Sequence, residues 1–158
     1  MTIEIHAIEA VQMEAFLERR RASLASFPVE MSLADNLSEI LRKANEFVPS
    51  LAGSILLDNP LTKRSDRRKN SLTFVAAFGD KAAQLIGREV PAAHGIAGWV
   101  YEHGEPYNTG DANGDQFFFD GVDAVTEYST QSVVAIPIRI EQEVCGVLEL
   151  INRVGAPD

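Results

Sequence analysis

The feature that most limits what this chain can fold into is an apolar hairpin pattern near the end of the sequence. Residues 132–140 (SVVAIPIRI) and 144–152 (VCGVLELIN) are rich in β-branched side chains and are separated only by the short stretch EQE. Two such runs joined by so short a turn are typical of paired antiparallel strands. Further strands are predicted at residues 52–59 and 71–79. The chain is therefore expected to build an antiparallel sheet.

Amphipathic helices are predicted before these strands. Residues 5–27 and 33–48 carry apolar side chains at spacings of three and four, and prolines at positions 28 and 49 end the two patterns. Shorter helices are predicted at 80–87 and 95–104, with helical content in the long connection at 112–129. These elements predict an α+β fold, a central antiparallel sheet with helices on both faces and the N-terminal helices packed on its back.

Composition excludes several classes of function. The chain has 158 residues, 14 basic against 23 acidic, and a formal net charge of -9. Nucleic-acid and membrane-surface partners require a basic face, so neither is expected. No apolar run approaches the length of a membrane span, and the acidic N-terminus does not resemble a signal sequence, which indicates a soluble cytoplasmic protein. One domain is expected from this length.

The sequence also lacks the residue patterns of an enzyme. His6, His94 and His103 have no metal-binding partners at helical or finger spacing, and no nucleophile elbow or phosphate-binding loop is present. The single cysteine, Cys145, lies inside a predicted strand and is expected to be a buried thiol. We therefore expect no catalytic residues, no metal ligands and no cofactor.

The stretch HGIAGWVYEHG (94–104) suggests an anion-binding helix N-terminus. A helix that starts near Ile96 leaves its first N–H groups without intrahelical acceptors, at the positive end of the helix dipole. Gly95 allows the turn that aims these groups outward and lets a ligand approach the backbone. The alternative is that Gly95 is a turn residue and the helix end meets water.

Several polar or aromatic residues stand out elsewhere. Asp123, Thr126 and Thr130 are spaced i, i+3 and i+7, so they form a polar stripe if their segment is helical. The stripe is either a hydrogen-bonding set for a heteroaromatic base and its sugar or an ordinary exposed helix face. Glu149 lies on an otherwise apolar strand, where it either faces a ligand or sits at an edge in water. Phe78, at a strand end, either stacks on a planar ring or packs in the core.

A cationic loop separates the first two predicted strands. Residues 60–70 (PLTKRSDRRKN) contain five lysines and arginines. A solvated hairpin tip is one interpretation and a binding patch is the other.

Three stretches together resemble a known family. GIAGWVYEHGEPYNTGDANGDQFF, STQSVVAIPI and EVCGVLELINR are similar to the GAF domain, a small ligand-binding sensor module, over roughly residues 33–153. The similarity is to the regulatory GAF domains of cyclic-nucleotide phosphodiesterases and bacterial adenylate cyclases in particular. The sequence ends soon after Asn152 and Arg153, where such domains usually continue into a C-terminal helix, so a fragment of a longer sensor is expected.

The resemblance implies a ligand pocket and its residues. Backbone N–H groups of the helix N-terminus would receive a cyclic phosphate, and the remaining positions would contact the base and ribose. The implied ligand-binding residues are Ser54, Phe78, Gly79, Ile96, Ala97, Asp123, Thr126, Thr130 and Glu149. The resemblance thus implies a sensor that binds cyclic AMP or cyclic GMP without turning it over.

The expected organisation has three parts: a dimerisation and signalling helix at 1–30, the GAF domain at 31–153 and a tail at 154–158. A homodimer through the N-terminal helices is the expected protein partner. Two alternatives stay open: a dimerisation and relay module with an empty pocket, and a pocket for a different small ligand.

Overall fold

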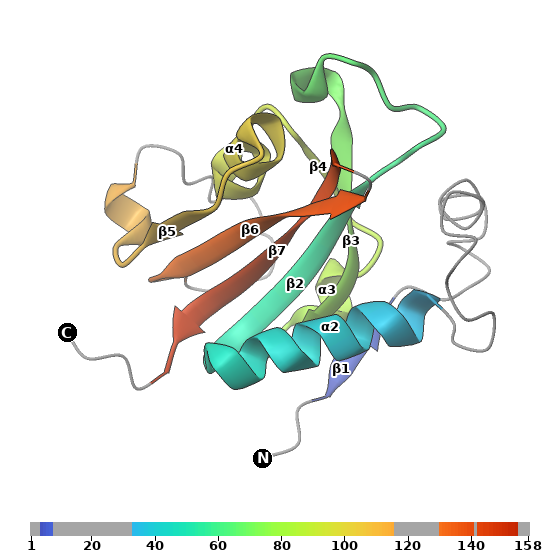
Figure 1. The fold of residues 1–158 in the computed structure, drawn as a ribbon. Helices are drawn as coiled ribbons and strands as arrows, with labels where there is room; N and C mark the ends of the chain where they lie inside the picture. Colours follow the sequence, from blue (N-terminus) through green and yellow to red (C-terminus); the bar gives the residue numbers. More distant parts are fainter. Residues whose placement is uncertain (1–3, 8–32, 116–129, 141, 155–158) are drawn as a thin grey trace.

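The computed structural model describes residues 4–7, 33–115, 130–140 and 142–154. In this part of the chain a single antiparallel sheet has the strand order β1-β3-β2-β7-β6-β5, and β4 also pairs with β3 (Figure 1). The strands are β1 (Ile5–Ala7), β2 (Ser50–Asp58), β3 (Ser71–Phe78), β4 (Glu89–Pro91), β5 (Tyr107–Thr109), β6 (Val133–Ile140) and β7 (Glu143–Arg153). The helices are α2 (Leu33–Phe47), α3 (Ala82–Leu85) and α4 (Gly95–His103), with single 3-10 turns η1 (Arg67–Lys69) and η2 (Ala112–Gly114). The α+β fold predicted from the hairpin and the helical patterns is confirmed.

The prediction of a helix beginning at residue 5 is wrong at its start. Residues 5–7 form β1, which pairs with the end of β3, so that Ile5 lies opposite Phe78 and Ala7 opposite Ala76. Ile5 and Ala7 pack against the core beneath α2. The alternation of apolar side chains at 5 and 7 suits a strand at the sheet edge. Pairing with β3 therefore decides the conformation of these residues, although their spacing also fits the helical pattern that continues after them. The rest of the predicted helix, 8–27, lies outside the described residues.

Two hydrophobic cores lie on opposite faces of the sheet. On one face, α2 places Leu37 and Leu41 against β2, β3 and β7; the strand residues of this core are Ile55, Leu57, Val75, Ala76, Phe78, Leu148 and Leu150. On the other face, α4 packs Ile96, Val100 and Tyr101 on the sheet; the strand residues of this core are Leu56, Leu72, Phe74, Val133, Ala135, Val144 and Val147. Alternate residues of β2 therefore serve different cores, as the two-residue period of a strand requires.

Two β-bulges change which face the strand residues occupy. Between β2 and β3 the register passes from Ile55 opposite Ala76 to Leu56 opposite Phe74, which leaves Val75 as the extra residue. Between β6 and β7, Cys145 is skipped in the same way. A bulge inserts one residue, so the side chains beyond it point to the opposite face from the one that simple alternation predicts.

Glycines set the limits and the position of α4. Gly95 begins the helix with φ 83°, and Gly104 ends it with φ 67°, donating its N–H to the carbonyl of Val100 at 2.8 Å. Positive φ is strained for residues with a Cβ, so both ends favour glycine. Inside the helix, a side chain at Gly98 would collide with the carbonyl oxygen of Ala92. The GIAG sequence therefore fixes where α4 begins and how closely it approaches the preceding loop.

Candidate functional site

A row of small and polar residues crosses the α4 face of the sheet. Ser54 lies between Ala77 on β3 and Glu149 on β7, and Glu149 lies opposite Ala135 on β6. Ala135 in turn lies opposite Tyr107 on β5. Ser54, Ala77 and Ala135 are all buried, and this row of small and polar side chains is the candidate floor of a ligand site.

Ser54 is the most informative member of this row. The residue is 1% exposed, and its Oγ has no hydrogen-bond partner among the described residues. Burying a hydroxyl without a partner costs about 1–3 kcal/mol, and buried polar groups in native proteins are nearly always paired. A bound molecule that hydrogen-bonds to Oγ would remove this cost.

Glu149 is half-buried next to Ser54, on the face also occupied by Val147. Cys145, further back on the same strand, lies at the bulge itself. Glu149 has a further interaction within the protein. It therefore contributes a carboxylate to this face rather than to an exposed sheet edge, since β7 lies between β2 and β6.

The N-terminus of α4 supplies the backbone groups that the sequence predicted. Its N-cap residue, His94, makes no side-chain capping bond to the helix. Ile96 is buried and Ala97 half-buried, both packed with the core on the α4 face. Ser54 lies on this same face of the sheet, so the helix start and the unpaired hydroxyl belong to one side of the molecule.

The three residues of the predicted polar stripe are only partly described. Thr130 is 3% exposed and has a partner within the protein. It precedes Gln131, whose carbonyl accepts from Ala112 N at 2.8 Å and whose N–H donates to Asn152 Oδ1 at 2.6 Å. Asp123 and Thr126 lie outside the described residues.

Phe78 is on the wrong face for the role that the resemblance implied. Its ring is buried in the core beneath α2, where it would collide with a side chain added at Gly53. The bulge at Val75 is the physical reason, because it turns Phe78 away from the face occupied by Phe74. Gly79 has φ 106°, and a Cβ there would lie 2.7 Å from Leu51 O, so it is required by the turn after β3.

A buried polar network that the sequence did not predict holds α4 at its other end. The hydroxyl of Tyr101 donates to Asp58 Oδ2 at 2.6 Å and accepts from Asn70 Nδ2 at 3.0 Å. Lys63 Nζ lies 2.9 Å from the same Asp58 oxygen and 2.6 Å from Glu143 Oε1. Tyr101 and Asp58 are both fully buried. A buried carboxylate requires such partners, and here α4 and the loop at 60–70 supply them.

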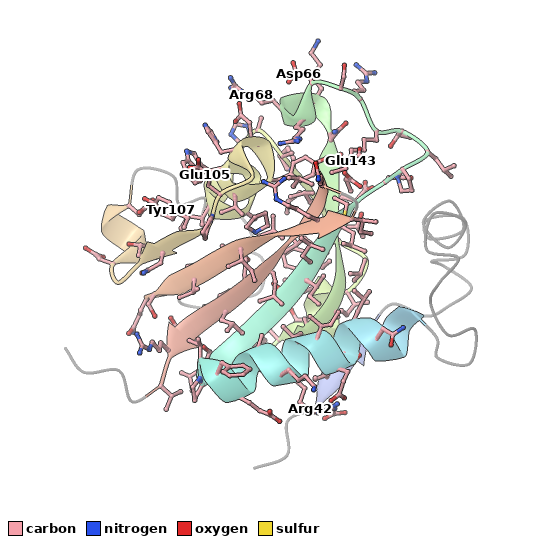
Figure 2. All side chains as sticks on the ribbon, viewed as in Figure 1. Arg42, Asp66, Arg68, Glu105, Tyr107 and Glu143 are labelled. Carbon is pink, nitrogen blue, oxygen red and sulfur yellow. The ribbon has the colours of Figure 1, made fainter. Side chains whose placement is uncertain are left out.

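Three cations of the loop, Arg64, Arg68 and Lys69, are exposed, as predicted for a solvated tip, whereas the other two contact the rest of the fold. Lys63 is bound in the network, and Arg67 Nη1 donates to the carbonyls of Tyr101 at 3.4 Å and Glu102 at 2.9 Å. Arg139 Nη2 donates to Gly104 O at 2.7 Å. Figure 2 shows Arg68 and Asp66 on the loop beside α4, and Glu143 at the start of β7. Arginines at the carbonyl end of a helix stabilise its dipole, so the loop caps α4.

Two tyrosines, Tyr101 on α4 and Tyr107 on β5, have hydroxyls with a raised pKa. Burial, followed by the hydrogen bond to Asp58, raises the pKa of Tyr101 far above its ordinary value. The pKa of Tyr107 is raised chiefly by its hydrogen bond to Asp115 Oδ2, at 2.6 Å. Both hydroxyls therefore stay protonated and act as donors across the physiological range.

Two further properties concern the described ranges as a whole. Within them, no group of three His, Cys, Asp or Glu side chains gathers in a way that suits a metal ion. No helix among these residues is long and apolar enough to cross a membrane.

Comparison with known families and sequences gives consistent matches. The GAF domain family matches residues 32–157. The cone cGMP-specific 3',5'-cyclic phosphodiesterase subunit alpha' of Bos taurus is 28% identical over 156 residues, which cover 99% of this chain and 16% of that protein. The dual 3',5'-cyclic-AMP and -GMP phosphodiesterase 11A of Takifugu rubripes is 42% identical over 66 residues, 41% of this chain and 7% of that protein. The chain therefore spans less than a fifth of the length of these relatives.

Solved structures show the same fold. The GAF domain of A. Aeolicus nlh2 in an inactive state has a TM-score of 0.61 at 15% identity, covering 92% of this chain and 82% of that one. Free methionine-R-sulfoxide reductase from Neisseria meningitidis, in complex with its substrate, has a TM-score of 0.58 at 16% identity, covering 96% and 80%. At these identities the similarity concerns the fold alone.

Proposed function

The chain belongs to the GAF domain family of small-molecule-sensing regulatory modules, and from that premise we propose that its α4 face binds a cyclic nucleotide, cyclic AMP or cyclic GMP. The observation that carries this proposal is the buried, unpaired hydroxyl of Ser54 on the face where α4 begins. Such a hydroxyl is costly in the free protein and gains a partner when a polar ligand binds.

The proposed roles follow the chemistry of each group. N–H groups of Ile96 and Ala97, at the start of α4, would hold the singly charged cyclic phosphate. Ser54, Glu149 and Thr130 would contact the base and ribose, because hydroxyls and a carboxylate match their donors and acceptors. The resemblance adds Asp123 and Thr126 to this set. Phe78 has no part in it, and Gly79 serves the turn.

The relatives support the ligand class. Two of them are named for cyclic GMP, or for both cyclic AMP and cyclic GMP, although this chain matches only a small part of each. In this proposal the chain is the cytoplasmic sensor region of a larger signalling protein, and catalysis belongs to other regions.

Thermal unfolding with each cyclic nucleotide tests the proposal. Ligand at one hundred times its dissociation constant stabilises the native state by about 2.7 kcal/mol, which corresponds to a rise in Tm of roughly 5–11 °C. Glu149→Gln should weaken binding, whereas Glu89→Gln, an exposed carboxylate on β4, should not. The absence of any shift at millimolar concentrations of either nucleotide would refute the proposed ligand.

A second candidate function is dimerisation and signal relay. Its support is an apolar surface at the C-terminal end of α2, formed by exposed Phe47, Leu51 and Val154, with Ile40 two turns earlier on the helix. Val154 N donates to Pro49 O at 2.8 Å, which holds the end of β7 beside the turn that follows α2. Light scattering of wild type and Phe47→Glu tests this candidate: a dimer that becomes a monomer supports relay, and a monomeric wild type opposes it.

A further inference from the structure

The second half of α4 is fixed to the sheet by directional contacts. The Tyr101 hydroxyl is held between Asp58 and Asn70, and Arg67 holds the carbonyl of Tyr101 and that of the next residue. Apolar contacts resist separation but not sliding or rotation, because the hydrophobic effect has no preferred direction. Hydrogen bonds restrict both distance and angle. The network therefore sets the position of the helix as well as holding it.

The Asp58–Tyr101 hydrogen bond, called the anchor below, and the candidate site share one strand. Asp58 and Ser54 lie on β2 four residues apart and on the same face, which separates them by about 13 Å along the strand. The anchor thus fixes the position of α4 relative to β2, the strand that carries the unpaired hydroxyl of Ser54.

The anchor is also close to the start of the helix. Ala97 and Tyr101 are four residues apart on α4 and lie on one side of it, about 6 Å apart along the axis. A shift of Tyr101 is therefore carried almost undiminished to the first turn, where the N–H groups of Ile96 and Ala97 lie.

We propose that Tyr101 is a positioning residue of the ligand site. Its hydroxyl, held by the buried Asp58, sets the distance between the first turn of α4 and Ser54. This inference rests on the proposed function, because the quantity it explains is affinity for a ligand that bridges these two features. The Asp58–Tyr101 hydrogen bond does not contact that ligand.

The test compares Tyr101→Phe with Val75→Ala, both in the full chain. Val75 is fully buried in the other core, so its truncation lowers stability without touching α4. Isothermal titration with cyclic AMP and cyclic GMP should show a roughly tenfold loss of affinity for Tyr101→Phe, because a helix position that is populated only about one tenth of the time lowers the apparent affinity by the same factor. Val75→Ala should stay within about twofold of wild type.

A rescue variant separates the hydrogen bond from the charge. Asp58→Asn keeps an oxygen that accepts from Tyr101 and should retain most of the affinity, whereas Asp58→Leu should match Tyr101→Phe. Equal affinity in Tyr101→Phe and wild type would overturn the inference, and so would equal losses in Tyr101→Phe and Val75→Ala.

Hydrogen exchange distinguishes failure of this inference from failure of the proposed function. The amides of residues 100–104 should exchange faster in Tyr101→Phe than in Val75→Ala, with or without nucleotide, and emission from Trp99, the only tryptophan, should change in parallel. Faster exchange with no nucleotide binding in wild type would refute the ligand and support the positioning of α4. Equal exchange in the two variants would overturn the positioning role itself.

Discussion

The two faces of the sheet use the same strands for different purposes. On the α2 face, β2 and β7 contribute Ile55, Leu57, Leu148 and Leu150 to a core of hydrophobic side chains. On the α4 face the same strands contribute Ser54, Asp58 and Glu149 among the hydrophobic residues. One face therefore supplies stability through apolar burial, and the other carries buried polar groups, whose burial is costly, at the contact with α4 and at the proposed ligand site.

Two buried polar side chains of β2 on the α4 face differ in whether they are paired. Asp58, at one end of β2, has Tyr101 and Lys63 as partners, whereas Ser54, on the same strand, has none among the described residues. Buried polar groups with a structural role are expected to be paired, so the unpaired hydroxyl of Ser54 is the one that points to a ligand. The following predictions test this division.

Lys63→Met should have the largest effect on stability. It leaves the Asp58 carboxylate buried without its ammonium partner, which costs about 3–5 kcal/mol. Urea unfolding measures the loss. Lys69→Met, an exposed lysine of the same loop, is the control and should change stability by less than about 0.5 kcal/mol. Equal free energies of unfolding for the two variants would show that the network does not stabilise the α4 face.

Leu41→Ala tests the apolar face. Leu41 lies on the side of α2 that faces the sheet and is fully buried, so truncation should destabilise the fold by about 3 kcal/mol. Affinity for cyclic nucleotide, measured below the transition, should not change. Lys43→Ala on the exposed side of α2 serves as the control. A large loss of affinity in Leu41→Ala would contradict the separation of the two faces.

Ser54→Ala should raise stability while reducing the affinity for ligand up to about tenfold. Removing a buried, unpaired hydroxyl is expected to stabilise the free protein by about 1 kcal/mol. Differential scanning calorimetry with and without nucleotide measures both effects, and Ser71→Ala, exposed at the start of β3, is the comparison. A destabilised Ser54→Ala variant would show that Oγ has a structural role.

The smallest effect is expected at alkaline pH. The fold keeps Tyr101 protonated, whereas an unfolded tyrosine ionises from about pH 10, so the contribution present below pH 10 falls as pH rises. At pH 10.5 the loss from this residue reaches at most about 0.8 kcal/mol. Urea midpoints at pH 8 and 10.5 should therefore differ less in Tyr101→Phe than in wild type. Identical pH dependence would mean that Tyr101 ionises as easily in the fold as outside it.

The sequence predicts elements well where the pattern is local and long. The hairpin at 132–152, the helix at 33–48 and the glycine-bounded α4 appear near their predicted bounds. The face of Phe78 was not predictable in this way. One extra residue at Val75 reverses the alternation of side chains between the two faces of β3, and the residue types of the strand do not reveal this bulge. Carrying a family's residue roles across positions fails where such an insertion intervenes.

The polar network was not predictable either. Asp58, Lys63 and Tyr101 are separated along the chain, and the pairing depends on how α4 crosses the sheet. The five cations at 60–70 could be recognised as a group, but the partners of Lys63 and Arg67 come from α4, β2 and β7. Ser54, by contrast, was identified through the resemblance, and the structure adds the reason why a serine there is unusual.

The strand order also has a consequence for how the molecule reaches its native state. β7 is the last of the described strands in the chain, yet it lies between β2 and β6, with Ser50 paired to Arg153. During synthesis, β2 must keep one edge open until β7 leaves the ribosome, because no earlier strand occupies that position. Closing so long a loop is slow, and an open strand edge invites pairing with other chains. Chaperone dependence should therefore be sensitive to residues 143–153, although most residues of the proposed ligand site belong to earlier elements.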